Sequence, residues 1–419
     1  MAAELSRLTA DAGAGDIEAQ LQLAELYDSG FGVPVDRGQA AYWYRQAAEL
    51  GSATGQSCLG QMYIRGIGVP QDYELAVHWL QQAAEQGDAV AQANLGWCCQ
   101  EGMGLVRDYE AARFWYEKAA QQGNAGARYN LGYMHANGIG TEKNAFEAVD
   151  WYGRAAAQGH VKAQLNLGMM YAAGEGTGKD LDKAIELYRE AAHRGYAKAQ
   201  YNLALMYSGG YGVEQDDDEA FKWQSKAAIQ GYYKAQYNLG LFYLYGLGTG
   251  RDPDEAFKLF RLASRQGYAK AFYQLAKMYA RGIGVQINEI EAAKHYIQAA
   301  EAGYAKAQYR LGRLYLNGEG VRHDPASGVR WFEKAAMQGH SGAQYSLAVC
   351  CLKGYGVGRD KVQACAWLIL ARGAGDEKID NVLRRIEALL PAEDLREANR
   401  LAEEWRAIYQ AGATVRGHQ

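Results

Sequence analysis

The sequence has 419 residues, a formal net charge of −4, and 49% hydrophobic against 22% charged residues. The near balance of charge excludes a general binder of nucleic acid or of membrane surfaces, although it does not exclude a local charged patch. The hydrophobic content excludes a disordered chain, even though glycine is unusually frequent with 51 residues.

The start of the chain and its cysteines predict a cytoplasmic protein. The stretch 1–13 has neither a basic start nor a long apolar run, so we expect no secretion signal. No segment approaches the roughly 18 consecutive apolar residues of a membrane-spanning helix, so we expect no membrane insertion. The six cysteines include two adjacent pairs and no CxxC motif, which predicts reduced, buried thiols rather than disulfides or a zinc site.

A glycine recurs every 36 residues along most of the chain. Ten repeats without insertion or deletion therefore run from 15 to 374, and residues 1–14 are expected to form an N-terminal capping helix. Positions within a repeat are counted from this glycine as position 0. The ten glycines are Gly15, Gly51, Gly87, Gly123, Gly159, Gly195, Gly231, Gly267, Gly303 and Gly339.

The first half of each repeat predicts an α-helix, helix A. Position 8 is leucine in all ten repeats, position 4 is usually alanine, and position 12 is usually tyrosine. Side chains four residues apart lie on one face of a helix, so these three positions predict a buried stripe. The leucines are Leu23, Leu59, Leu95, Leu131, Leu167, Leu203, Leu239, Leu275, Leu311 and Leu347.

Two glycines at positions 15 and 17 follow helix A in every repeat. The first suits a left-handed helix cap, and the second permits a tight reversal of the chain. Position 21 is always Asp or Asn, which predicts the N-cap of a second helix, helix B. Each helix pair is too small to be stable alone, so we expect the pairs to stack into one continuous core.

The stretch 375–409 departs from the repeat and predicts two capping helices. The first keeps the phase of helix A through Leu383, and Pro391 separates it from the second. A stack of repeats needs such a polar end. The last residues, 410–419, are expected to form a flexible tail.

The repeated pattern AxAQYxLGxxYxxGxGVxxDxxxAxxWYxxAAxxG resembles Sel1-like repeats, which are related to tetratricopeptide repeats. The resemblance covers about 360 of the 419 residues. It implies an all-α fold, a right-handed superhelical α/α solenoid of ten 36-residue repeats with a C-terminal capping helix pair. It also implies a non-catalytic role in protein–protein interaction, and a charged terminal helix pair of this kind is familiar in bacterial members.

No motif predicts catalysis, a metal site or a cofactor. The segment GEGTGKD at 174–180 lacks the first glycine and the final Ser or Thr of a phosphate-binding loop, and it follows a helix rather than a strand. In the acidic run 216–219, Asp216 is the predicted cap of helix B and the other carboxylates occupy the first helical turn. The fixed repeat length leaves no elaborated loop for an active site.

Positions 3, 7, 10 and 14 of helix A lie away from the buried stripe, and the family resemblance places them in a concave groove. The amides at position 7 can hydrogen-bond the backbone of an extended peptide. They can equally bond a neighbouring helix as part of the scaffold, and both interpretations stay open. Position 7 carries Asn94, Asn130, Asn166, Asn202, Asn238, Gln274 and then Arg310.

The predicted groove changes character along the chain. Positions 10 and 14 are largely apolar or aromatic in repeats 3–7, where they include Trp97, Tyr133 and Tyr245. In repeats 8 and 9 they become cationic, and Arg is frequent among residues that dominate binding energies. Solubility alone explains the lysines of position 3, but not the other cations. The cationic residues are Lys270, Lys277, Arg281, Lys306, Arg310 and Arg313.

These features predict a non-enzymatic scaffold that binds a partner peptide or domain in its groove, with an apolar segment of the partner over repeats 3–7 and an acidic segment over repeats 8 and 9. The alternative is a cytosolic inhibitor or immunity protein that wraps one toxin or enzyme. A third hypothesis is a sensor of a small anionic ligand, or an enzyme. Nucleic acid is not an expected partner, because the basic patch spans two repeats and lacks base-stacking neighbours.

Overall fold

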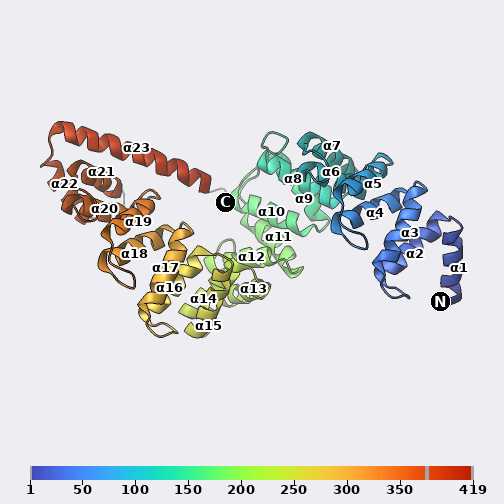
Figure 1. Ribbon diagram of the computed structural model, residues 1–419, viewed down its shortest axis with the longest axis horizontal. Helices are drawn as coiled ribbons and strands as arrows, with labels where there is room; N and C mark the ends of the chain where they lie inside the picture. Colours follow the sequence, from blue (N-terminus) through green and yellow to red (C-terminus); the bar gives the residue numbers. More distant parts are fainter. Residues whose placement is uncertain (1, 373–376, 417–419) are drawn as a thin grey trace. The chain divides into compact units, whose positions relative to one another are not determined.

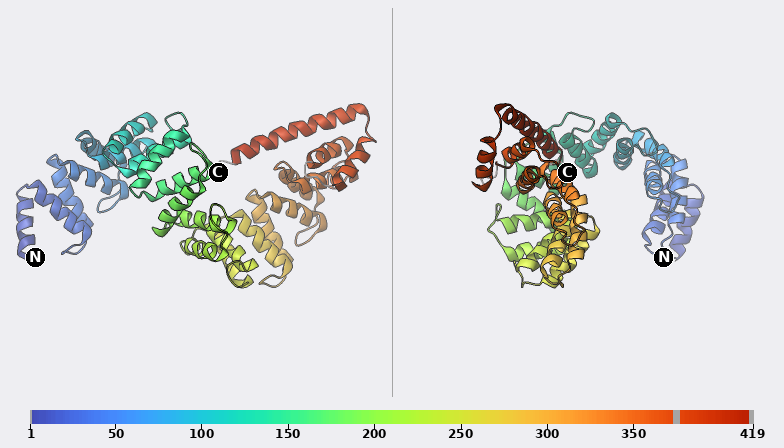
Figure 2. Two further views of the ribbon diagram at one scale, coloured as in Figure 1. Left: turned by 180° about the vertical axis from the view of Figure 1, so that it is seen from behind. Right: turned by 60° about the vertical axis from the view of Figure 1, so that its left-hand side comes forward.

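The structure is a computed structural model that describes residues 2–372 and 377–416, and over these residues it consists of 23 helices and no strand (Figure 1). The chain divides into two compact units, Met1–Ala199 and Gln200–Gln419. Each helix packs against the next one in sequence from α1 to α11 and from α13 to α22, and α23 packs against α21 (Figure 2). The predicted all-α fold of paired-helix repeats is confirmed. The predicted boundary at 374–375 lies outside the described residues.

Each repeat contains two helices joined by a short turn. The A helices are α2 (Ile17–Ser29), α4 (Ala53–Arg65), α6 (Ala89–Glu101), α8 (Ala125–Asn137), α10 (Val161–Ala173), α12 (Ala197–Gly209), α14 (Tyr233–Tyr245), α16 (Ala269–Arg281), α18 (Ala305–Asn317) and α20 (Ser341–Lys353). The B helices are α3 (Arg37–Glu49), α5 (Tyr73–Glu85), α7 (Tyr109–Gln121), α9 (Ala145–Ala157), α11 (Leu181–His193), α13 (Asp217–Ile229), α15 (Pro253–Arg265), α17 (Glu289–Glu301), α19 (Pro325–Ala336) and α21 (Lys361–Ala371). The flanking helices are α1 (Ala2–Gly13), α22 (Glu377–Glu387) and α23 (Ala392–Arg416).

The core of each repeat lies between its two helices. All ten leucines of position 8 are buried, with at most 6% of their surface exposed, so the predicted stripe is confirmed there. The tyrosines of position 12 are mostly only half-buried, and the deepest aromatic side chains belong instead to helix B. Tyr116 and Tyr152 are examples, and each packs against a glycine of the paired helix A, Gly96 or Gly132. The absence of a Cβ at that glycine leaves room for the ring.

The repeat glycines at positions 0, 15 and 17 have left-handed backbone conformations. All thirty of them have positive φ, and no other residue of the described chain does. At position 15 the glycine is the predicted left-handed cap of helix A, and its N–H bonds a carbonyl of the last turn.

The glycine of position 17 has a second role that the sequence pattern does not reveal. A Cβ on Gly104 would overlap the backbone carbonyl of Tyr73, at the start of helix B in the preceding repeat. Gly68 and Gly320 meet the carbonyls of Arg37 and Glu289 in the same way. These turns are therefore in direct backbone contact with the previous repeat, and only glycine allows that approach.

The predicted N-cap of helix B is confirmed in all ten repeats. Each Asp or Asn at position 21 accepts a hydrogen bond from a backbone N–H in the first turn of the helix. In repeat 1, for example, Asp36 Oδ1 accepts from the Gln39 N–H at 3.0 Å. A cap of this kind contributes about 1 kcal/mol to helix stability.

Aromatic pairs also join successive repeats and involve several of the tyrosines. The ring at position 1 packs against the ring at position 6 of the preceding repeat, as in Tyr232 with Tyr201, whose centroids are 5.2 Å apart. Tyr232 makes no cap hydrogen bond, so the aromatic contact offsets the loss of a cap. His340 does both: its Nδ1 accepts from the Ala343 N–H, and its ring lies 4.7 Å from Tyr309. Burial lowers the pKa of His340, which favours the neutral ring that can accept this bond.

A network of buried glutamines also links the repeats. The glutamine of position 5 donates to a carbonyl eight residues earlier, at the end of the preceding helix. Its own Oε1 accepts from a second glutamine at position 35, as when Gln122 donates to Gln92 at 2.8 Å. The glutamines that donate in this way are Gln20, Gln56, Gln92, Gln164, Gln236, Gln308 and Gln344.

The network is incomplete where position 35 is not glutamine. Leu50 stands there in repeat 1 and Arg194 in repeat 5. The buried Oε1 atoms of Gln20 and Gln164, the acceptors in those two repeats, have no hydrogen-bond partner. Gln20 still donates to Ala12 of α1, so α1 supplies the carbonyl that a helix B supplies elsewhere.

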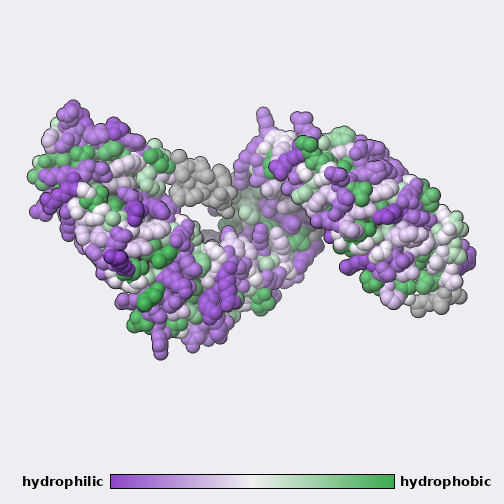
Figure 3. Space-filling model, viewed as in Figure 1, coloured by the Kyte–Doolittle hydropathy of each residue, from purple (hydrophilic) through white to green (hydrophobic). Residues whose placement is uncertain are grey.

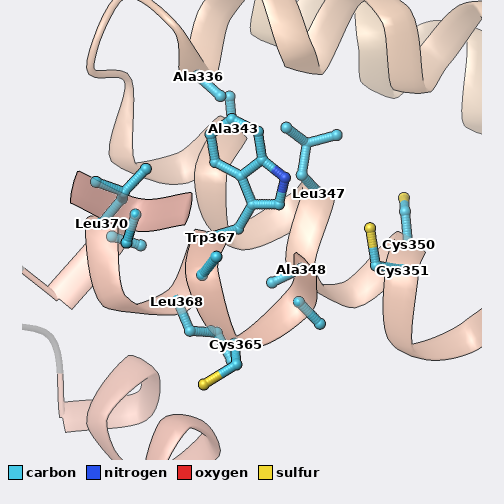
Figure 4. Close-up of a cluster of buried hydrophobic side chains, with 14 of the residues drawn as sticks. Ala336, Ala343, Leu347, Ala348, Cys350, Cys351, Cys365, Trp367, Leu368 and Leu370 are labelled. Carbon is cyan, nitrogen blue, oxygen red and sulfur yellow. The ribbon is translucent and has the colours of Figure 1, made fainter. Parts of the chain in front are cut away.

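The C-terminal helices cover the last repeat. Trp405 of α23 stacks on Trp367 of α21 with ring centroids 4.0 Å apart. Trp367 belongs to a buried cluster with Ala343 and Leu347 (Figure 4). Helix α23 continues through 410–416, where the sequence predicts a flexible tail, and residues 417–419 lie outside the described part of the chain. Five of the six cysteines are buried and Cys58 is half-buried, all as free thiols.

We predict that Leu50→Gln stabilises the protein. The new amide can donate to the unpartnered Gln20 Oε1, and an added intramolecular hydrogen bond contributes about 0.5–1.5 kcal/mol. Leu50 is 53% exposed, so little apolar packing is lost. Thermal unfolding and native-state hydrogen exchange of α2 measure the gain. Leu50→Glu is the matched control, because it has the same length but no donor; an equal gain in both variants would contradict the explanation.

We also predict that Gly104→Asn is more damaging than Gly102→Asn. Both glycines have φ of 72°, a conformation that Asn tolerates, so the backbone cost is the same at both sites. Only Gly104 lies against the carbonyl of Tyr73, and overlap of this kind costs about 1–3 kcal/mol. Thermal unfolding followed by circular dichroism compares the two variants. Equal destabilisation would show that the close contact between repeats is unimportant.

Candidate partner-binding surface

The side chains predicted to bind a partner all lie on A helices, and they are divided between the two compact units. Asn94, Trp97, Asn130, Tyr133 and Asn166 belong to the first unit, and all the others belong to the second. On the face shown in Figure 3, hydrophobic residues form small separate patches among hydrophilic ones. The six predicted cations, Lys270, Lys277, Arg281, Lys306, Arg310 and Arg313, are called the basic surface below, and all six lie within the second unit.

The amides of position 7 are half-buried, or buried in the case of Gln274. Asn166 donates to the hydroxyl of Tyr152 at 3.1 Å, and Gln274 donates to the hydroxyl of Tyr237 at 3.4 Å. Both tyrosines belong to the preceding repeat. These contacts favour the scaffold interpretation for Asn166 and Gln274 over direct binding of a peptide backbone.

The predicted aromatic residues differ in accessibility. Tyr245 is 60% exposed and Tyr133 is 39% exposed. Trp97 is half-buried and packs against the core of repeats 2–4. Tyr133 and Tyr245 are therefore the aromatic side chains with most surface available to a partner.

Four predicted residues meet in one cavity of about 270 Å³, cavity 7/8, between the A helices of repeats 7 and 8. Arg251 completes its cationic lining; it lies in the turn before helix B and donates from Nε to the Leu244 carbonyl at 3.2 Å. The charge pattern of helix A does not reveal Arg251, because this residue lies in the turn and not on the helix. The lining contains no carboxylate, and it consists of Leu244, Tyr245, Arg251, Gln274, Lys277, Met278, Arg281 and Ile283.

Lys277 and Arg310 are the two half-buried cations of the basic surface, and the other four are exposed. The Nζ of Lys277 donates to Gln274 Oε1 at 3.2 Å and lies 5.9 Å from the centre of the Tyr273 ring. Burial lowers the pKa of Lys277, and the positive charges of Arg281 and Lys306 lower it further. The cations of this region therefore repel one another, and an anion placed between them would relieve that repulsion.

A second cavity, cavity 9/10, lies between the A helices of repeats 9 and 10 and has a volume of about 320 Å³. Its cations are Arg313 and Lys353, and again its lining contains no carboxylate. It occupies the same place in the repeat as cavity 7/8. Leu316, Cys350 and Lys353 correspond in position to Leu244, Met278 and Arg281 of cavity 7/8.

The equivalent place between repeats 8 and 9 is neutralised by the chain itself. Glu319 lies 3.4 Å from Arg310 and accepts a hydrogen bond from Asn317 at 2.7 Å. Arg310 also lies over the ring of Tyr296, 6.0 Å from its centre. Of the predicted cations, Arg310 is therefore already engaged within the protein.

A corresponding cavity in the first unit, cavity 1/2, lies between the A helices of repeats 1 and 2 and also contains its own acid. Asp28 lines it and forms an ion pair with Arg37 at 3.8 Å. Arg65 occupies position 14, as Arg281 and Lys353 do in the second unit. Cavities 7/8 and 9/10 differ from it in having cations without a lining carboxylate.

The described residues offer no other arrangement that indicates chemistry. Within 2–372 and 377–416, no three His, Cys, Asp or Glu side chains are grouped so that they could hold a metal ion. None of the helices in this part of the chain combines the length and apolar composition needed to cross a membrane.

Comparison with protein families matches the Sel1 repeat ten times. The matched segments are 17–52, 55–88, 89–124, 125–160, 161–196, 197–232, 234–268, 269–304, 305–340 and 341–376. A comparison with curated proteins finds no match.

Solved structures of Sel1-type proteins are similar over most of the chain. The structure of c5321, a protective antigen present in uropathogenic Escherichia coli strains and displaying an SLR fold, is 34% identical; the match covers 98% of this chain and 88% of that one with a TM-score of 0.80. A Sel1 repeat protein from Oxalobacter formigenes is also 34% identical, with 75% and 94% coverage and a TM-score of 0.61. The ten repeat matches and these similarities agree: the chain belongs to the Sel1 repeat family.

Proposed function

We propose that the chain is a non-catalytic scaffold that binds a protein partner, and that its basic surface receives an acidic segment of that partner. The observation that carries this proposal is cavity 7/8, which gathers Arg251, Lys277 and Arg281 without a carboxylate in its lining. Proteins of the Sel1 repeat type generally act by binding other proteins, so a surface of this kind has a natural use as a docking site.

The pairing of other cations in the chain supports the proposal. Lys143, Lys222 and Lys258 each form an ion pair with a nearby carboxylate, at 3.2, 2.6 and 2.8 Å respectively. Lys277 and Arg281 form no such pair in the described part of the chain. Like charges that lie close together lower the stability of the free protein. A partner that supplies the opposite charge would remove this repulsion on binding.

The remaining features fit a binding scaffold. The repeats keep one length throughout, so function depends on the side chains presented by helix A rather than on long loops. The exposed ring of Tyr245 beside the cations adds an apolar contact of the kind that often dominates binding energy. The alternative of an inhibitor that wraps a single toxin or enzyme stays a prediction, because no contact in the structure favours it.

We predict that the double charge reversal Lys277→Glu, Arg313→Glu slows the association with a partner that binds the basic surface. Opposite charges accelerate association and make it sensitive to salt, so the variant should associate at least about tenfold more slowly and lose most of the salt dependence. Proteins captured from the native lysate by the wild-type chain identify partners, and association rates are then measured with each purified partner at several salt concentrations.

The matched control is Lys162→Glu, Lys198→Glu, which makes the same change in net charge at exposed lysines of the first unit. It should retain both the partners and their rates. Lys277→Gln, Arg313→Gln should give an intermediate effect, and circular dichroism verifies that all variants are folded. Equal loss in the control, or unchanged rates in the reversed variant, would contradict the proposal.

A further inference from the structure

We propose that cavities 7/8 and 9/10 bind two carboxylates of one extended acidic segment, about six residues apart in the partner. This inference rests on the proposed function, because it specifies how the basic surface and the neighbouring repeat recognise the partner. It changes the expected ligand from any acidic stretch to one with a defined spacing.

The two cavities lie at the same place in the repeat and share one cation. Each lies between successive A helices, and each has a cation at position 14 of the second helix, Arg281 in cavity 7/8 and Lys353 in cavity 9/10. Each also has a further cation at a position of its own: Lys277 is on the second A helix of cavity 7/8, and Arg313 is on the first A helix of cavity 9/10. A ligand group that fits one cavity therefore meets similar chemistry in the other.

Glu319 indicates that the ligand group is a carboxylate. It lies at position 16, in the equivalent place between the two cavities, where its two oxygens contact Arg310 and Asn317. At the same position, cavity 7/8 has Ile283 and cavity 9/10 has Tyr355, neither of which carries a charge. The chain thus supplies its own carboxylate between repeats 8 and 9, and it leaves cavities 7/8 and 9/10 for carboxylates of a ligand.

The spacing follows from the repeat. Helix A packs on its own helix B, and that helix B packs on the next helix A. Packed helices lie about 8–10 Å apart, so we place equivalent points on A helices of successive repeats about 10 Å apart, and those two repeats apart roughly 20 Å apart. An extended chain advances about 3.3–3.6 Å per residue, so roughly six residues span that distance. Acidic groups about three residues apart would instead place one of them beside Glu319, which repels it.

Fluorescein-labelled peptides measure the preferred spacing directly. Each peptide carries two Glu-Glu pairs about three, six or twelve residues apart in a Gly/Ser/Thr chain, and a further peptide carries one pair. Fluorescence anisotropy with the full chain at low salt gives the affinities. We expect the spacing of about six to bind at least about tenfold more tightly than the other peptides, because only it occupies both cavities at once.

Three substitutions at position 14 test which cavities are involved. Arg281→Ala and Lys353→Ala should each lower the affinity for the peptide with the six-residue spacing to that for the one-pair peptide. Arg65→Ala is the matched control, because it removes the same cation from the same helical position in cavity 1/2, where Asp28 already provides a carboxylate. Circular dichroism verifies that each variant keeps its helical fold.

Glu319→Gln tests the role of the carboxylate between repeats 8 and 9. Removal of its charge frees Arg310, so the peptide with the three-residue spacing should gain more affinity than the peptide with the six-residue spacing. The expected result is a shift in preference, which a general increase in positive charge would not produce.

Affinity that is independent of spacing, or equal loss in Arg65→Ala, would overturn the inference. The proposed function would survive that result if capture of a partner still depended on Lys277 and Arg313. Conversely, a preference for the six-residue spacing without any captured partner would support the two-cavity site and count against the scaffold role.

Discussion

The close contact between successive repeats is the constraint on which the rest of the structure depends. The turn after each helix A approaches the start of the preceding helix B so closely that a Cβ at Gly104 would overlap a backbone carbonyl. The buried glutamines cross the same junction with hydrogen bonds from one repeat to the carbonyl of the one before, as Gln92 does to Ala84. Aromatic pairs such as Tyr201 with Tyr232 add a third contact. Because all three contacts need fixed positions, no repeat can change its length without losing them.

This constraint divides the positions of the repeat into those that maintain the fold and those that can vary for binding. Position 8 is filled by leucine, positions 15 and 17 by glycine, and position 21 by a helix cap, so these positions vary little between repeats. The A-helix positions 7, 10 and 14 vary along the chain, and there the second unit accumulates cations that lack carboxylate neighbours. Stacked repeats that share one backbone structure but differ in the side chains of one face can recognise an extended segment, because each repeat contacts its own part of the ligand.

Most of the fold was predictable from the sequence, because strict periodicity reports local structure directly. The glycines, the leucine stripe and the caps of helix B each repeat ten times, so chance resemblance is excluded. The contacts between repeats were not predictable, since the glutamine of position 5 is as ordinary in sequence as any surface glutamine. Its burial is decided by the preceding helix. Likewise, the sequence does not show that Leu50 affects stability. It does so only because the buried Oε1 atom of Gln20 has no hydrogen-bond donor there.

The candidate site was predictable in part. Charge patterning identified Lys277, Arg281 and Arg313, which the structure places in cavities without carboxylates. It did not reveal that Arg310 forms an ion pair with Glu319, or that Arg251 lines the same cavity as Lys277. Both contacts depend on residues of the turns that follow helix A. For the position-7 amides the sequence left a binding role and a scaffold role open, and the hydrogen bonds of Asn166 and Gln274 to tyrosine hydroxyls of the preceding repeat favour the scaffold role for these two.

We propose that a partner binds the A-helix face of the second unit. A lysine-acetylation footprint, read by mass spectrometry for the chain alone and in complex with a captured partner, tests this proposal. We expect Lys277, Lys306 and Lys353, all on A helices, to become protected, while Lys222, Lys258 and Lys294 on B helices keep their reactivity. Protection of the helix-B lysines with unchanged reactivity at Lys277 and Lys353 would contradict it.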